Sequence, residues 1–290
     1  MMNLHSRYDQ DQALWQVSSD SGILLEYIHG ELDDPNPSFR QVKTPEGHAI
    51  ALYRPWDHPW HPGLFFSWKY LNGLNFWESM HAGQRNVAVT ERFLPVEGRE
   101  PGFRQRIAYV THEGEALLRE ERTVSVVALP ESGGYLIRWQ GEFGPVSGDV
   151  TLDRTKATEQ SPWGGYAGLS CRLARNFLGP DITTDARAFL AEEAHGRPFR
   201  WCDYSGKLDG FLEKRRAGVC LMDAPGNPRH PTSMLTYDYK DMQFLHAAFL
   251  YDEPYTLRLG ETLTLAYGIF VHDGEAASAT IERIYREAFN

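Results

Sequence analysis

The sequence is short of cysteine, of long apolar runs and of positive charge, and each shortage excludes a class of protein. Its 290 residues include only three cysteines, Cys171, Cys202 and Cys220, with no CxxC pair among them. An odd number at such wide spacing is typical of neither a disulfide framework nor a zinc knuckle, so a reducing compartment is the simplest expectation. No apolar run approaches the roughly 20 residues that a membrane-spanning helix needs.

The excess of acidic side chains argues against a nucleic-acid partner. The sequence has 39 Asp and Glu against 29 Lys and Arg, which gives a formal net charge of −10 at pH 7. Such an acidic surface repels phosphate backbones. Because residues 1–12 are polar and lack the apolar core of a signal peptide, we expect a cytoplasmic protein that binds neither nucleic acid nor membrane. The oligomeric state stays open.

Short, strand-like segments separated by turn residues run through most of the chain. Examples are 22–28, 64–70, 116–128 and 262–271, and Asn72-Gly73 is a strong hairpin signal. So many strands with so little helix between them predict a mainly β fold, a large antiparallel β-sandwich. No repeat or boundary divides the sequence, so we expect a single sandwich domain over residues 1–290.

Three segments carry more specific expectations. Residues 185–194 are predicted to form a short helix. Apolar residues from 281 to 289 follow helical spacing, which predicts a C-terminal helix with one face packed on the sandwich. Residues 117–127 mix Arg and Glu with Val, a composition typical of a solvated outer strand.

A proline-stiffened segment holds the densest collection of chemically active side chains. The sequence Arg54-Pro-Trp-Asp-His-Pro-Trp-His-Pro-Gly63 places Asp57, His58 and His61 within five residues. Its prolines hold the backbone extended and exclude a helical HExxH motif. Histidine transfers protons near neutral pH and ligates metals, and a nearby aspartate orients the ring or ligates as well. The alternative is that these histidines only cap turns.

Later blocks add further polar and aromatic residues. Arg172 lies in an otherwise apolar strand, so it needs a carboxylate or a ligand oxygen as its partner. Asp203 and Tyr204 offer a carboxylate and a phenol, while Asn227 serves equally well as a turn residue. The sequence thus predicts His58, His61, Asp57 and Asp203 as catalytic residues and, as substrate-binding residues, Trp56, Trp60, Lys69, Arg172, Tyr204, Asn227 and His230.

Five sequence blocks taken together resemble one known family. They are DHPWHPGLFFSWKYLNGLNFW (57–77), WGGYAGLSCRLAR (163–175), RWCDYSG (200–206), AGVCLMDAPGNPRHP (217–231) and VHDG (271–274). In this order they resemble a bacterial family of unknown function labelled PmoA, or methane oxygenase subunit. The usual first block of that family resembles DHPHHRG, and Trp60 and Pro62 here replace its middle His and its Arg. The resemblance implies a supersandwich of the galactose mutarotase-like type, in a setting of sugar catabolism.

The first functional hypothesis is an enzyme that acts on a sugar or an oxidised sugar derivative, as an epimerase, lyase or hydrolase. His58 or His61 would be the acid and base, with Asp57 or Asp203 tuning the ring. Guanidinium and ammonium groups would hold hydroxyls or a developing oxyanion, and aromatic rings would stack on the sugar. The implied partner is a small sugar ligand.

Two other hypotheses stay open. In the second, the enzyme depends on a divalent metal that His58 and His61 bind together with a distant ligand, for which the candidates are His230, His272 and Glu78. In the third, the protein is a non-catalytic sugar-binding module whose histidines are structural.

Overall fold

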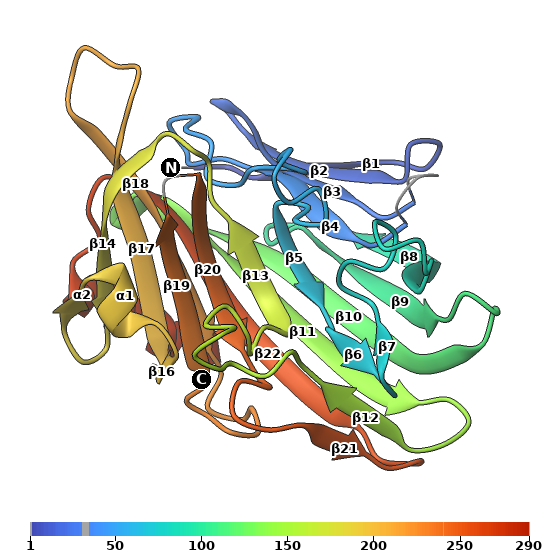
Figure 1. The fold of residues 1–290 in the computed structure, drawn as a ribbon. Coiled ribbons are helices and arrows are strands. Elements are labelled where there is room, and N and C mark those ends of the chain that lie inside the picture. The colour runs from blue at the N-terminus through green and yellow to red at the C-terminus, as the bar shows by residue number, and fades with distance from the viewer. Residues whose placement is uncertain (1, 31–34, 240, 290) are drawn as a thin grey trace.

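Two nine-stranded antiparallel sheets lie face to face and form the bulk of the molecule (Figure 1). The computed structural model describes residues 2–30, 35–239 and 241–289. The first sheet has the order β1 (His5–Asp9), β2 (Leu14–Ser19), β3 (Gly22–Ile28), β4 (Ser38–Val42), β5 (Leu64–Ser67), β13 (Gly168–Arg172), β20 (Met242–Ala248), β19 (Ser233–Tyr239) and β16 (Arg197–Pro198). The sandwich predicted from the short strands is confirmed.

The second sheet faces the first and carries the longest strands. Its order is β15 (Ala188–Phe189), β14 (Phe177–Thr184), β17 (Trp201–Leu208), β18 (Arg215–Asp223), β22 (Leu263–Asp273), β11 (Gly134–Pro145), β10 (Ala116–Leu129), β9 (Gly102–Val110) and β8 (Val87–Val96). A small sheet at one edge has the order β21 (Tyr255–Leu257), β12 (Val150–Asp153), β6 (Tyr70–Leu71) and β7 (Leu74–Asn75). The β6–β7 hairpin turns at Asn72 and Gly73, as predicted, with both residues at positive φ.

Strand alternation decides which side chains enter the core between the sheets. In β13, Leu169 and Cys171 belong to the main core cluster, so Ser170 and Arg172 project from the opposite face. The neighbouring strand β20 behaves alike: Leu245 is in the main core, whereas its neighbours along the strand project outward. At β13, β19 and β20 the outer face of the first sheet is therefore buried as well, and this second buried layer holds the candidate site.

The expectation of a solvated outer strand at residues 117–127 holds for only one face of β10, which exposes Arg119, Glu121 and Thr123. Glu120 and Arg122 point into the sandwich core, where they are 0% and 2% exposed. The Arg122 guanidinium pairs with the Glu120 carboxylate through two nitrogens and also donates to the Tyr27 hydroxyl at 2.9 Å. The Tyr109 hydroxyl donates to Glu120 at 2.7 Å. The charges are buried because each one finds its partner inside the core.

The two predicted helices fare differently. The C-terminal helix α2 (Ser278–Phe289) is confirmed, and its apolar face packs on Trp201, Met222 and Phe270 of the second sheet. The helix predicted over 185–194 is wrong in its first half, since only α1 (Ala191–Ala194) is helical. The Thr184 hydroxyl oxygen accepts the N–H groups of Ala186 and Arg187, which turns the chain so that β15 pairs back on β14. Apart from a 3₁₀ turn at Pro130–Ser132, the described chain has no other helix, and none there is long and apolar enough to cross a bilayer.

Replacing Arg122 with alanine should lower the free energy of unfolding by about 3–5 kcal/mol, because the Glu120 carboxylate is then left in the core without its countercharge. Urea unfolding followed by tryptophan fluorescence measures the change. The matched control is Arg106→Ala, since the Arg106–Glu121 ion pair stands on the solvent face of β9 and β10. We expect the control to change stability little. Equal costs in the two variants would contradict a stabilising role for the buried network.

Candidate functional site

A cavity of about 160 Å³ opens on the outer face of the first sheet. Its floor comes from β19 and β20, and its walls come from the proline-rich loop and from the segments that follow β7 and precede β13. Most of the side chains that line it are aromatic, and its imidazole and carboxylate groups belong to His58, His61 and Glu78. The full lining is His58, Trp60, His61, Trp77, Glu78, Trp163, Tyr166, Tyr237, Met242 and Phe244.

The proline-rich loop of residues 54–63 is fixed by its own backbone. The N–H of His58 donates to the Pro55 carbonyl at 3.1 Å, and the N–H of His61 donates to the His58 carbonyl at 2.9 Å. These two consecutive turns bring both imidazoles to the same side. Gly63 ends the loop at a φ of 84°, and a Cβ there would collide with the backbone carbonyl of Phe39. The loop can therefore leave for β5 only through a glycine.

The Asp57 carboxylate is the anchor of this loop. One oxygen, Oδ2, lies 2.7 Å from Nη2 of Arg172 and 2.8 Å from Nδ1 of His58, while the other pairs with Arg175. Burial alone would raise the pKa of Asp57, but the hydrogen bonds from His58 and Arg172 and the guanidinium charge outweigh burial and lower that pKa to about 2. Asp57 thus stays ionised and holds the proton of His58 on Nδ1. This satisfies the expectation that Arg172 needs a carboxylate partner.

The second nitrogen of His58 is left for a ligand. Across the described ranges nothing forms a hydrogen bond with Nε2 of His58, whose side chain is 35% exposed and lines the cavity. An imidazole whose Nδ1–H is held by a carboxylate presents Nε2 as a proton acceptor, and after protonation as a donor. The arrangement has the elements of a general acid and base.

His61 lies directly behind His58 and differs from it electrically. The two rings stack at 4.8 Å between centroids, and His61 stacks equally closely on Phe244. Burial lowers the pKa of His61 well below its ordinary value, and the positive charge that His58 and Arg172 carry when protonated lowers it further. The side chain is therefore a neutral imidazole. Its Nδ1 is buried and accepts no hydrogen bond from the part of the chain that the structure describes.

Glu78 gives the cavity a carboxylate that is held from two sides. The Lys69 ammonium forms an ion pair with it, and the Tyr166 hydroxyl donates to it at 2.9 Å. Lys69 is 4% exposed, with its ammonium near the rings of Tyr70 and Tyr166. Burial and the charge of Glu78 raise the pKa of Tyr166, so the phenol keeps its proton. Lys69 thus acts on the site through Glu78, which the sequence indicated only as a metal candidate.

Several predicted residues lie away from the cavity. Trp60 lines it, but Trp56 is 79% exposed and stacks under the Arg175 guanidinium outside it. Tyr204 points into the sandwich core, where its hydroxyl donates to the Tyr237 carbonyl at 3.2 Å. Strand alternation then sends Asp203 to the far side of the second sheet. The structure does not bring this pair to the histidines of the proline-rich loop.

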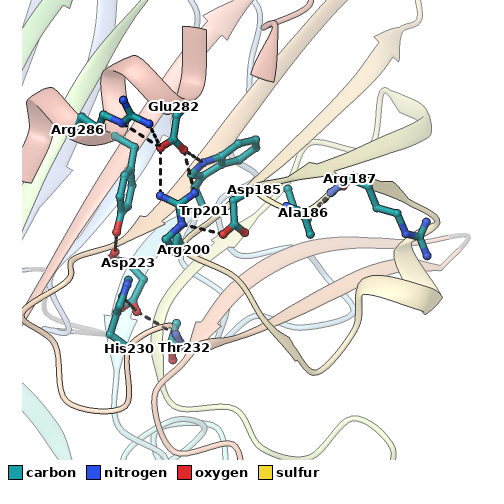
Figure 2. A network of polar contacts seen from close by, with 12 residues as sticks. Asp185, Ala186, Arg187, Arg200, Trp201, Asp223, His230, Thr232, Glu282 and Arg286 are labelled. Atoms are coloured by element: carbon teal, nitrogen blue, oxygen red, sulfur yellow. Dashed lines mark hydrogen bonds and ion pairs between the residues drawn. The ribbon is translucent and has the colours of Figure 1, made fainter. Parts of the chain in front are cut away.

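Asn227 and His230 serve the loop in which they stand. Figure 2 shows the Asp223 carboxylate beside His230 and Thr232. Nδ1 of His230 lies 2.8 Å from Asp223, and the Asn227 amide donates to Asp223 at 2.7 Å while its oxygen accepts the N–H of Ala266. The proline-glycine loop wraps around one buried carboxylate, so its polar residues face inward rather than toward the cavity.

The metal ligands expected for His58 and His61 do not assemble. His230 bonds to Asp223 and His272 bonds to Asp203 at 3.0 Å, both away from the cavity. Glu78 is engaged by Lys69 and Tyr166. Among the residues described, no third His, Cys, Asp or Glu brings a ligand atom close enough to complete a metal site with these two histidines.

The sequence missed most of the aromatic lining. Tyr237 and Phe244 read as ordinary strand residues, because alternation alone does not tell which face of a doubly buried sheet meets a ligand. His246, also on that face, is structural: its Nε2 accepts the N–H of Ala167 at 3.0 Å and its Nδ1 meets the Ser170 hydroxyl at 2.7 Å. Burial lowers the pKa of His246 to about 3. The sequence feature that indicated an aromatic lining was the pair of aromatic residues in the 163–166 segment.

The fold and the cavity define a large antiparallel β-sandwich with an aromatic, histidine-bearing site on one outer face. A family model described as a family of unknown function, DUF6807, matches residues 15–286, and the chain belongs to that family. The expected membership of a family labelled PmoA is wrong, since the matching family is DUF6807 and nothing indicates a methane oxygenase subunit.

Two solved structures show a weak similarity to the chain. They are the heparan sulfate lyase HepC from Pedobacter heparinus and a mutant of that enzyme, with 8% and 7% sequence identity and TM-scores of 0.45 and 0.42. Each match covers 94% of this chain but only 37% of the other, so this chain corresponds to a minor part of those proteins. No curated protein matches the sequence.

The buried His272–Asp203 pair should give the protein a characteristic dependence of stability on pH. Burial disfavours the imidazolium, but the charge and hydrogen bond of Asp203 outweigh burial and raise the pKa of His272 above 6.5. A raised pKa contributes stability that is complete below pH 6.5 and is lost as the pH rises through the folded-state value. Asp203→Asn should remove this fall in stability above pH 6.5, measured by urea unfolding from pH 6 to 9. Glu113→Gln, beside the exposed His112, is the control that should leave the fall intact.

Proposed function

We propose that the protein is a carbohydrate-active enzyme, with His58 as the acid and base at the cavity. The observation that carries the proposal is the Asp57–His58 pair: a carboxylate that stays ionised orients an imidazole whose Nε2 is open to an aromatic cavity. That combination serves proton transfer, and the surrounding rings suit the apolar faces of a sugar.

The shape and lining of the cavity support a sugar ligand. Trp60, Trp77 and Trp163 present indole rings around it, while the fixed Glu78 carboxylate offers oxygens that accept hydrogen bonds from hydroxyl groups. Six of the ten lining residues are aromatic. An amphipathic ligand with both hydroxyls and C–H faces matches this mixture better than a purely apolar ligand does.

The basicity of imidazole limits the reactions that His58 can catalyse. A neutral imidazole is too weak a base to take a proton from an unactivated carbon, so a C–H bond next to a carboxyl or carbonyl group is required. An oxidised sugar supplies such a bond, and its deprotonation leads to epimerisation or β-elimination. Hydrolysis requires instead that His58 protonate a leaving oxygen or activate water. We place His61 beside it as a neutral imidazole that contacts the ligand or the proton-transfer path.

The test is to incubate the protein in D₂O with a panel of neutral sugars, aldonates and uronates. NMR and mass spectrometry then detect exchange of sugar protons with solvent and any new product. With at least one member of the panel, the unaltered protein should catalyse deuterium incorporation into the sugar or its conversion to unsaturated or reducing products. His58→Ala should lower that turnover by about 10²–10⁴-fold, the usual contribution of a general acid or base, with binding retained. His61→Ala should likewise abolish turnover, and circular dichroism checks its fold. His112→Ala, an exposed histidine, is the matched control.

Full turnover in His58→Ala would reject His58 as the acid and base, and full turnover in His61→Ala would reject the role of His61 beside it. Calorimetry that shows sugar binding unaffected by either substitution, without turnover of any panel member, would replace the enzyme with a non-catalytic sugar-binding module. In that case Trp77→Ala should still weaken binding, because stacking does not depend on the histidines.

A further inference from the structure

A second cluster of ligand-type side chains lies where the two large sheets meet at the end of β22. The hairpin of residues 43–49 that follows β4 is closed by pairing of Lys43 with Ala49, and it turns at Gly47. It lays Glu46 and His48 against Asp273, the last residue of β22. This cluster shares no residue with the aromatic cavity.

The three side chains offer a mixed oxygen and nitrogen set of ligand atoms. One such atom from each of Glu46, His48 and Asp273 lies within 4.8 Å of the other two. Nε2 of His48 and Oε2 of Glu46 are 3.5 Å apart. One imidazole and two carboxylates form a set that borderline divalent cations accept, and a small inward shift would close it to coordination distance.

Buried atoms without partners mark this cluster as incomplete. His48 is 6% exposed, yet within residues 2–30, 35–239 and 241–289 its Nε2 has no hydrogen-bond partner. Asp273 is half-buried and its carboxylate also interacts with the Thr44 side chain; within those ranges Oδ1 itself is shielded from solvent and makes no hydrogen bond, whereas Oδ2 accepts the backbone N–H of Glu46 at 2.9 Å. A buried acceptor left unpaired is costly, so Nε2 of His48 and Oδ1 of Asp273, close to the Glu46 carboxylate, favour the binding of a cation between them.

We propose that Glu46, His48 and Asp273 bind one divalent cation of the zinc type. Arg215 is its competitor, because Nη1 of Arg215 donates to Oε2 of Glu46 at 2.9 Å. The Arg215 side chain is 38% exposed and also lies 3.8 Å from Glu213, so it has a second carboxylate to move to when the cation binds. The bound ion connects the hairpin of residues 43–49, which follows β4, to the end of β22 in the second sheet.

The experiment is titration of Zn²⁺ into tag-free, chelator-treated protein, followed by calorimetry and thermal melting. We expect one tightly bound Zn²⁺ per chain and a melting temperature several degrees higher, since a ligand of the native state stabilises it. Glu46→Gln, at an exposed carboxylate, should weaken binding about tenfold or more without disturbing the fold, and His48→Ala should abolish it. Arg215→Gln should tighten binding several-fold. His112→Ala, which alters another histidine next to a glutamate, should leave binding unchanged.

Three results would overturn the proposal. They are no stoichiometric Zn²⁺ binding, binding that survives both Glu46→Gln and His48→Ala, and binding that is lost in His58→Ala instead. The last result would place the ion at the aromatic cavity. The outcome is independent of the proposed sugar chemistry, because neither His48 nor Glu46 contacts that cavity.

Discussion

The ion pair between Asp57 and Arg172 is the constraint on which the site depends. Arg172 is fully buried on β13, at the centre of the first sheet, and its guanidinium reaches outward to a carboxylate in a loop more than a hundred residues earlier in the chain. A buried guanidinium without an anion is strongly destabilising, so the loop is tied down by electrostatics as well as by its prolines. The same carboxylate sets the tautomer of His58. One ionised group therefore secures both the position and the chemistry of the loop.

The described residues form three aspartate–histidine ion pairs, and the surroundings of each pair determine its role. In the pairs Asp57–His58, Asp223–His230 and Asp203–His272, the histidine side chains are 35%, 18% and 0% exposed. All three pairs share the same contact between imidazole and carboxylate. The ring of His58 borders the cavity, that of His230 holds its own loop, and that of His272 is buried on the second sheet. Access of a ligand to the far nitrogen, rather than the pair itself, distinguishes a reactive histidine from a structural one.

Local patterns predicted some elements correctly, whereas pairing between distant segments decided the others and the site. The Asn72-Gly73 turn and the apolar spacing of the last helix are local signals, and both were predicted. Residues 117–127 misled because alternating charged residues look solvated unless their partners, Tyr27 and Tyr109 on other strands, are known. The helix expected over 185–194 failed since the Thr184 hydroxyl bonds to the backbone as a turn instead of starting a helix.

The candidate site shows the same division. His58, His61, Asp57 and Trp60 were predicted because one stiff, polar, aromatic stretch of sequence holds them, and Arg172 was predicted because it lies in an otherwise apolar strand; the structure brings Arg172 to Asp57. Asn227 and His230 have equally suggestive neighbours, but their loop closes on Asp223. Which loops converge follows from β5 lying beside β13 and β13 beside β20, an order set by pairing between distant segments. No spacing rule within the sequence contains that information.

The detour of the chain between β5 and the cavity wall has a mechanical consequence. After β5 the backbone leaves the first sheet, makes the β6–β7 hairpin in the small sheet, and returns with Trp77 and Glu78, whose N–H groups both donate to the Asn75 side chain. Lys69 enters that hairpin and Glu78 leaves it, and their ion pair fastens its two ends together. The floor of the cavity thus belongs to the first sheet, and one wall belongs to the loop that leaves the small sheet after β7. The position of that wall therefore depends on the Lys69–Glu78 ion pair, which ties the residue after the hairpin to the residue before it.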